Sequence, residues 1–218
     1  MSDSNDSGGA TPAPADPTAT DGGVPDPAAY DAVVYDLDGT LVELVVDWEA
    51  VAESVLGVYT DHAVKPPTSD LWGLLESADD YGIGQPVEEA IALHERSGAR
   101  DSTILPLGER LIAASTRAAE NESASGRPSV GVCSLNCEEA CRIAVETHGL
   151  DAAIDGDAVV GRDTVESHKP EPESLLAAID RLGASPEHAL FVGDSERDAV
   201  AAERAGVDYA WASELLGR

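Results

Sequence analysis

Lysine is nearly absent from this sequence, since only Lys65 and Lys169 occur among its 218 residues. Lys plus Arg number 13 against 42 Asp plus Glu, which gives a formal net charge of -29 at pH 7. This balance excludes a nucleic-acid partner, because phosphate backbones are bound by clustered basic side chains. An acidic substrate is also repelled unless a cation or a local positive group compensates.

The acidic surplus, with its alanine-rich and lysine-poor composition, is typical of proteins made for a high-salt cytoplasm. At about 1 M salt the Debye length shrinks to ~3 Å, so repulsion between surface carboxylates is screened. We therefore expect a halophilic protein, with an ordinary acidic protein as the alternative.

Aromatic residues make up only 4% of the chain, and long apolar runs are missing. The core must then be filled by alanine, valine and leucine. No run approaches the ~20 residues of a membrane helix. No basic segment followed by an apolar one stands at the N-terminus, so a secretory signal is not visible. We expect a cytoplasmic monomer or homodimer without a membrane partner.

Cysteine is also scarce, and Cys133, Cys137 and Cys141 are spaced four residues apart. On one helix face they would resemble a metal-binding box. No matching pair of Cys or His with zinc spacing accompanies them. We interpret them as buried small residues, because free cysteine is often buried.

The first 28 residues contain Ser, Gly, Pro, Thr, Ala and Asp but no Lys or Arg. Such a segment buries too little apolar surface to offset its ordering entropy. A disordered acidic tail is therefore predicted over residues 1–28.

Short apolar runs then alternate with amphipathic segments. Strands are predicted at 32–37, 130–133, 158–160, 189–192 and 209–212, and helices at 48–57, 87–96, 105–115, 138–148, 172–182 and 199–205. This alternation favours an α/β fold with a Rossmann-like parallel sheet core.

The stretch between the first two strands is too long for one crossover. Its pattern is helical, and Pro66, Pro67, Gly82, Gly84 and Pro86 are expected to divide it into short helices. We therefore predict a small α-helical domain over residues 43–105, inserted into a core of residues 29–42 and 106–218. Its Trp48 is expected to be a core anchor rather than a platform for the substrate.

Polar side chains gather where the predicted strands end. In VVYDLDGTLV, Asp36 and Asp38 close the first strand. Ligands of open parallel sheets bind outside the carboxyl ends of the strands. Later segments deliver further polar groups to the same edge: Ser134, Asn136, Lys169, Asp194, Ser195 and Asp198.

Several carboxylates at one edge cannot all ionise without a compensating cation. Mg²⁺ suits them because it is a hard ion that takes oxygen ligands. An EF-hand calcium loop would also begin with DxD, but it requires glycine at its sixth position. That position is Leu41, so the sequence favours a magnesium site.

Four segments in order resemble the haloacid dehalogenase (HAD) superfamily of phosphatases. They are DLDGTLV, the serine after a second apolar strand, HKPEPESL and FVGDSERDAVAAERAG. The resemblance covers most of the chain from about Val33 onward. It implies a HAD-like core in which residues 43–105 are the cap, and a substrate such as phosphoglycolate or a related sugar or acid phosphate.

The resemblance also implies catalytic roles. Asp36 would be the nucleophile that forms an aspartyl-phosphate. Asp38 would protonate the leaving oxygen and later activate water. Mg²⁺ would be held by the carboxylates of Asp36 and Asp194 and the backbone carbonyl of Asp38. Lys169 would offset the charge of the phosphoryl group and of Asp36.

Binding roles follow in the same way. Ser134 would hydrogen-bond a phosphoryl oxygen, helped by the backbone N–H groups of Leu135 and Asn136. Thr40 would tie down the turn beside the substrate. Two residues would lie behind the metal ligands: Asp198, and Ser195, which either fixes Asp194 by a hydrogen bond or caps a helix.

Three alternatives remain at this stage. A phosphomutase of the same fold keeps both aspartates, and no feature of the sequence decides against it. A dehalogenase is disfavoured, because its family members lack an acid at the position of Asp38. A phospho-accepting receiver domain or a silent phosphate-binding module is disfavoured by the insert and by Asp36, Asp38 and Lys169 together.

Overall fold

The structure is a computed structural model, and it describes residues 23–120 and 126–217. Most of the predicted acidic tail lies outside these residues. Its last part is described, and there Pro27–Ala29 form a short 3-10 helix (η1). The Asp26 carboxylate accepts the Ala28 N–H and so caps this helix.

A five-stranded parallel sheet forms the core, in the order β5-β4-β1-β6-β7. The strands are β1 (Ala32–Tyr35), β4 (Ser129–Cys133), β5 (Val159–Val160), β6 (Ala189–Gly193) and β7 (Asp208–Trp211). Every predicted strand is present, with ends shifted by no more than two residues. The predicted α/β fold is therefore confirmed.

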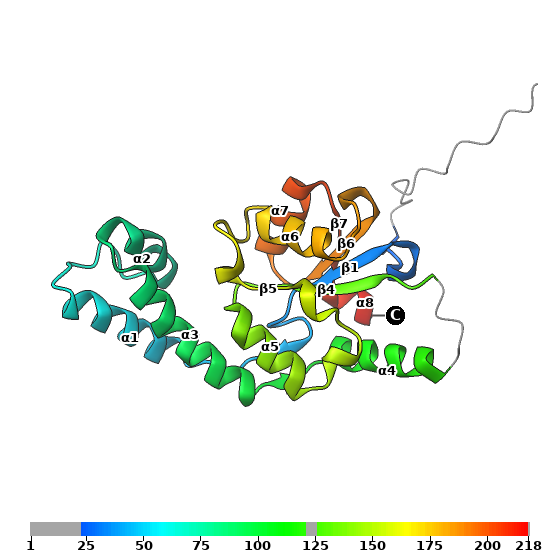
Figure 1. Cartoon of the computed structure of the whole chain (residues 1–218), viewed down its shortest axis with the longest axis horizontal. Coiled ribbons are helices and arrows are strands. Elements are labelled where there is room, and N and C mark those ends of the chain that lie inside the picture. The colour runs from blue at the N-terminus through cyan, green and yellow to red at the C-terminus, as the bar shows by residue number, and fades with distance from the viewer. Residues whose placement is uncertain (1–22, 121–125, 218) are drawn as a thin grey trace, which may run out of the picture.

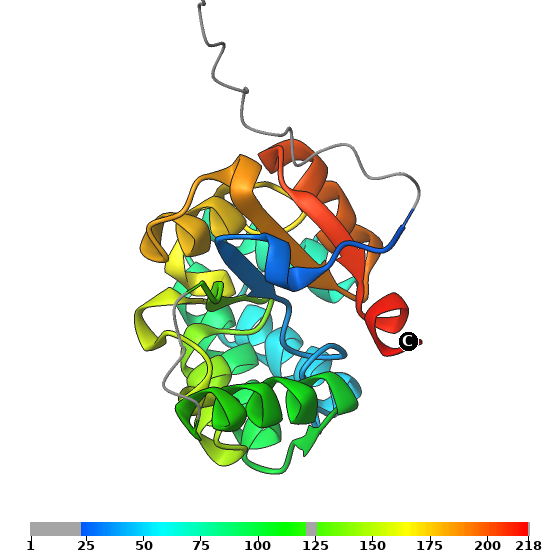
Figure 2. The ribbon, with the colours of Figure 1, turned by 90° about the vertical axis from the view of Figure 1, so that its right-hand side faces the viewer.

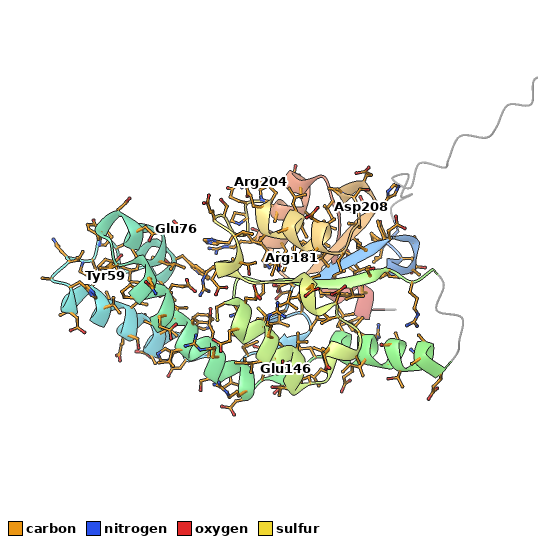
Figure 3. All side chains as sticks on the ribbon, viewed as in Figure 1. Tyr59, Glu76, Glu146, Arg181, Arg204 and Asp208 are labelled. Carbon is orange, nitrogen blue, oxygen red and sulfur yellow. The ribbon has the colours of Figure 1, made fainter. Side chains whose placement is uncertain are left out.

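Helices cover both faces of the sheet (Figures 1 and 2). Along β1, Val33 and Tyr35 belong to one hydrophobic cluster and Ala32 and Val34 to the other, because side chains alternate between the faces of a strand. The first face packs α4 (Pro106–Glu120), α5 (Glu138–Thr147) and α8 (Ala212–Leu216), and the second packs α6 (Glu173–Arg181) and α7 (Glu196–Ala205). In Figure 3, Arg204 marks the α6–α7 side and Glu146 the opposite side.

Residues 43–105 form a helical bundle to one side of the sheet (Figure 1). It contains α1 (Trp48–Asp61), α2 (Leu71–Ala78), a 3-10 turn η2 (Asp79–Tyr81) and α3 (Gly84–Arg100). The antiparallel strands β2 (Val42–Glu43) and β3 (Thr103–Ile104) join its two ends. The bundle has its own hydrophobic cluster, which includes Val51, Val55, Tyr59, Leu74 and Val87. We call residues 43–105 the insert.

The predicted break near Gly82, Gly84 and Pro86 is present at Gly82 and Ile83, but Pro86 lies inside the first turn of the next helix. Helix α3 begins at Gly84 and continues through Pro86 for 17 residues. Proline is tolerated there because the first N–H groups of a helix have no intrahelical acceptor. The turn before α3 ends at Gly82, whose φ of 72° suits glycine.

Helix α3 packs into two hydrophobic clusters at once. Its Val87 and Ile91 belong to the cluster of the insert. Its Ala92 and Ala99 belong to the cluster below the sheet, with residues of α5. Gly98 lies close to the backbone, since a Cβ there would sit 2.6 Å from the carbonyl oxygen of Val45.

Two further expectations have clear outcomes. Trp48 is 42% exposed, so it is not a core anchor. The three cysteines are free and buried, as predicted. They share no helix face, because Cys133 ends β4 and Cys137 precedes α5. Among the described residues, no helix combines the length and apolar character needed to cross a bilayer.

Candidate active site

A cavity of about 190 Å³ opens at the carboxyl edge of the sheet. Its walls come from the ends of β1, β4 and β6, from the segment before α6, and from the insert. The lining residues are Asp36, Asp38, Trp48, Trp72, Ser134, Leu135, Asn136, Lys169, Asp194 and Ser195. Nearly all residues predicted for the site are therefore neighbours.

Asp36 lies at the end of β1 and is 6% exposed. Its backbone N–H donates to the carbonyl of Val192, 2.8 Å away, which ties it to β6. Lys169 Nζ donates to Asp36 Oδ1 at 2.7 Å and to Asp198 Oδ1 at 2.6 Å. One ammonium group thus serves two buried carboxylates.

Burial raises the pKa of Asp36 to about 7, and the Asp198 carboxylate adds to the rise while Lys169 opposes it. Burial likewise raises the pKa of Asp194, again with a contribution from Asp198. Lys169 keeps its charge, because Asp36 and Asp198 raise its pKa despite its burial. The carboxyl groups of Asp36, Asp194 and Asp198 thus face a single ammonium group, and a further cation would favour their ionised forms.

A cation fits the donor set. One carboxylate oxygen from each of Asp36, Asp194 and Asp198 lies within 4.8 Å of the other two. Three carboxylates are hard oxygen ligands of the kind that Mg²⁺ takes. Gly39 has a φ of 84°, and a Cβ there would collide with the Asp194 carboxylate, so glycine lets the loop after β1 reach that carboxylate.

The carboxylate of Asp38 is not part of this group. Its Oδ1 accepts the backbone N–H of Leu44 at 2.8 Å, within a tight turn closed by Gly39 N–H and the Val42 carbonyl. Burial raises the pKa of Asp38 to about 6, partly opposed by that hydrogen bond. A carboxyl group with a raised pKa is suited to give and take a proton near neutral pH.

The loop after β4 brings Ser134 and Asn136 to the cavity. Both side chains are buried, and Ser134 Oγ donates to Asn136 Oδ1 at 3.1 Å. The Asn136 N–H donates to Ser134 Oγ at 3.2 Å. The loop therefore holds its hydroxyl and amide groups in one compact turn beside Asp36.

Of the two roles considered for Ser195, the structure shows the helix cap. Ser195 Oγ and the Asp198 N–H interact at the start of α7, and Ser195 Oγ donates to Asp198 Oδ2 at 2.6 Å. A hydrogen bond from Ser195 to Asp194 is not what fixes this turn. Asp198 uses one oxygen for this cap and the other for Lys169, and one of its oxygens lies within 4.8 Å of those of Asp36 and Asp194.

The structure gives no support for Thr40 as a substrate-binding residue. It is 2% exposed and does not line the cavity. Its N–H donates to the Leu37 carbonyl at 3.2 Å, but among the described residues its Oγ1 finds no hydrogen-bond partner. The turn is instead held by backbone groups.

Two tryptophans of the insert were missed as site residues. Trp48 and Trp72 line the cavity from the first turns of α1 and α2. The Trp72 ring lies 5.2 Å from the Arg197 guanidinium and 6.4 Å from the His168 ring. The available signal was a capping aspartate, Asp47 directly before Trp48 and Asp70 two residues before Trp72, which places each ring in the first turn of a helix.

Comparisons with known protein sequences identify relatives of this chain. Residues 123–212 match the profile of the haloacid dehalogenase-like hydrolases. A phosphoglycolate phosphatase of Rhodospirillum rubrum is 33% identical over 190 residues, which are 81% of this chain and 76% of the relative. A pyrophosphatase PpaX of Oceanobacillus iheyensis is 27% identical over 187 residues, 82% of this chain and 81% of the relative.

Solved structures share the fold. A HAD-superfamily hydrolase of subfamily IA from Geobacter sulfurreducens superposes with a TM-score of 0.53 at 24% identity, over 83% of this chain and 88% of that one. A hydrolase from Pseudomonas syringae superposes with a TM-score of 0.57 at 20% identity, over 82% of this chain and 83% of that one.

Proposed function

The chain belongs to the haloacid dehalogenase-like hydrolases, and we propose that it is a Mg²⁺-dependent phosphatase that hydrolyses a small phosphorylated metabolite. One observation carries the proposal: Asp36 lies at the base of a cavity, held by Lys169 and grouped with the oxygens of Asp194 and Asp198. This is the arrangement that a nucleophilic carboxylate next to a bound cation requires.

In the first step, an oxygen of Asp36 attacks phosphorus and the bond from phosphorus to the leaving oxygen breaks. Asp38 gives its proton to that oxygen, so the leaving group departs as a neutral alcohol. Ser134 and the backbone N–H of Leu135 bind phosphoryl oxygens, because the Asn136 N–H already donates to Ser134 Oγ. The carboxylates of Asp36 and Asp194 and the Asp38 carbonyl would hold Mg²⁺, which would supply positive charge to offset the anions of the site.

In the second step, Asp38 acts as the base. It takes a proton from water, the water oxygen attacks phosphorus, and the bond to Asp36 breaks. Inorganic phosphate leaves and the Asp36 carboxylate is restored. Lys169 stays charged throughout and keeps Asp36 in one orientation.

The size of the cavity supports a small substrate. About 190 Å³ accommodates a phosphoryl group with a short carbon chain, such as phosphoglycolate or a small sugar phosphate. The insert would act as the cap that closes over this substrate and excludes water, with Trp48 and Trp72 facing it. We further propose that the enzyme works in a salt-rich cytoplasm, in keeping with its net charge of -29.

The test is a screen of phosphorylated metabolites, pyrophosphate and a generic aryl phosphate with Mg²⁺ in molar KCl, with phosphate release measured. We expect release that EDTA abolishes. Asp36→Asn should lower turnover by at least about a thousandfold while the fold is retained. The control is Asp31→Asn, an exposed aspartate near the other end of β1. Turnover in Asp36→Asn contradicts the mechanism, and an isomerised product without phosphate release would indicate a mutase.

A further inference from the structure

A buried ion-pair cluster joins the insert to the core. Arg162 belongs to the 3-10 turn η5 (Arg162–Thr164) after β5 and is 4% exposed, while Glu95 of α3 is 0% exposed. Arg162 contacts both oxygens of Glu95, at 2.7 and 3.1 Å, and also both oxygens of Glu88. We call Arg162, Glu88 and Glu95 the Arg162 cluster.

The same residues hold the loop of residues 134–137, by three side-chain hydrogen bonds and one from the Arg162 backbone. Glu95 Oε2 accepts the Cys137 N–H at 2.9 Å, and Glu95 Oε1 lies 3.4 Å from Asn136 Nδ2. Arg162 Nη1 donates to the Leu135 carbonyl at 2.5 Å, and the Arg162 N–H donates to the Asn136 carbonyl at 2.9 Å. Four hydrogen bonds thus connect the cluster to the loop that lines the cavity.

Stability alone is a poor reason for this cluster. Replacing a buried ion pair by well-packed apolar residues is often neutral or stabilising, because desolvation offsets the attraction between the charges. What the cluster does uniquely is orient polar groups of the loop. The carbonyls of Leu135 and Asn136 are directed to Arg162, and carbonyl oxygens facing the cavity would repel a phosphoryl group.

We propose that Glu95 and Arg162 are positioning residues that hold loop 134–137 in the conformation that receives the phosphoryl group. The inference rests on the proposed function, since it assigns this loop to phosphoryl binding. Glu95 belongs to the insert, so the same contacts couple helix α3 to the loop.

The first test uses inorganic phosphate as a competitive inhibitor of aryl phosphate hydrolysis. Glu95→Gln keeps the shape of the side chain but removes its charge. We expect both KM and the inhibition constant for phosphate to rise roughly tenfold, with a smaller change in kcat, because the loop loses its fixed geometry. Glu89→Gln is the matched control on α3, since Glu89 is exposed and pairs with Arg96 at 2.6 Å. It should change neither constant by more than about twofold.

The second test needs no variant. Phosphate added to the wild-type protein should shift the NMR signals of the Arg162 Nε–H and the Cys137 N–H, because linkage between two sites is reciprocal. The Arg96 Nε–H is the internal control and should not move. Folded Glu95→Gln with unchanged constants, or bound phosphate without a shift at Arg162 and Cys137, overturns the positioning role. Absence of phosphatase activity in the wild type overturns the proposed function instead.

Discussion

Lys169 and Asp36 stand 133 residues apart in the chain, yet Lys169 Nζ lies 2.7 Å from Asp36 Oδ1 in the buried base of the cavity. The same ammonium donates to Asp198 at 2.6 Å. Since it is shared by two carboxylates, it orients Asp36 without neutralising the whole group. The remaining negative charge is what a divalent cation would balance.

Removing this ammonium should affect both folding and catalysis. Lys169→Met keeps the length of the side chain but leaves two buried carboxylates without their partner. We expect the free energy of unfolding to fall by about 3–5 kcal/mol and kcat to fall at least about a hundredfold. Urea unfolding and aryl phosphate turnover measure the two effects. Lys65→Met, at the exposed second lysine, is the control, and its free energy of unfolding should stay within about 0.5 kcal/mol of the wild type. Equal effects of the two variants would refute the role of Lys169.

Trp72 should influence substrate binding more than stability. Trp72→Ala removes one wall of the cavity and the contact with Arg197, 5.2 Å from the ring. We expect KM for the preferred metabolite to rise roughly tenfold, because the substrate loses apolar contact and water enters. Tyr81→Ala is the control, because Tyr81 is an exposed aromatic residue of the insert outside the cavity lining. A KM that does not respond to Trp72→Ala would place the substrate elsewhere.

Two helical glycines should respond in opposite directions to alanine. At Gly98 a Cβ would sit 2.6 Å from the backbone oxygen of Val45, so Gly98→Ala should destabilise the fold by about 1–3 kcal/mol. At Gly57 nothing lies within 4 Å of such a Cβ, so Gly57→Ala should stabilise by roughly 0.5–1 kcal/mol. Thermal unfolding in molar KCl compares them. A stabilising Gly98→Ala would contradict the close approach of α3 and the chain at Val45.

Salt should control both stability and activity. With a net charge of -29, the folded chain repels itself unless counterions screen it. We expect Tm in dilute buffer to be lower by roughly 10 °C or more than in 3 M KCl. Sucrose provides the control, because it favours compact states without screening charge. Full stability in dilute buffer would refute halophily and leave the mechanism untouched.

Alkaline pH should weaken the anchor of the N-terminal segment. The Tyr30 hydroxyl donates to Asp208 Oδ2 at 2.7 Å, and burial, with Asp208, raises the pKa of Tyr30 above its usual range. A raised folded pKa means that the neutral form stabilises the fold fully below about pH 10, and that this contribution is lost as pH rises further.

Tyr30→Phe should therefore lower the free energy of unfolding by about 1 kcal/mol at pH 8. Urea unfolding of the wild type and of Tyr30→Phe at pH 8 and pH 10.5 measures this effect. The difference between their free energies of unfolding should be smaller at pH 10.5 than at pH 8. A difference that stays constant or widens would contradict a stabilising hydrogen bond from neutral Tyr30 to Asp208.

The sequence predicts the sheet well because its strands are short apolar runs, and it predicts the neighbours of Asp36 because parallel strands bring their carboxyl ends to one edge. It predicts the insert less well. Pro86 suggests a break, but the first turn of α3 accommodates it. Trp48 suggests a core residue, but Asp47 caps α1 beside the cavity and leaves the ring 42% exposed.

The Arg162 cluster could not be predicted from local pattern. Glu95 and Arg162 are 67 residues apart, and each stands in an ordinary segment. Their pairing depends on how α3 lies against the core, where Ala92 and Ala99 join the cluster below the sheet. Hydrophobic periodicity predicts helices and strands, but it does not predict which charged side chains become buried together in the tertiary structure.

Because the unbroken helix α3 is a member of both apolar clusters, we expect the insert to unfold together with the core and not to move relative to it as a separate rigid body. Heating should give one cooperative transition for the whole molecule, and opening of the mouth must come from bending of α3 or from movement of α1 and α2 around it. The half of α3 that carries Val87 can therefore change in sequence together with α1 and α2. The half that carries Ala99 packs against the core that holds the catalytic residues, so its sequence is more restricted.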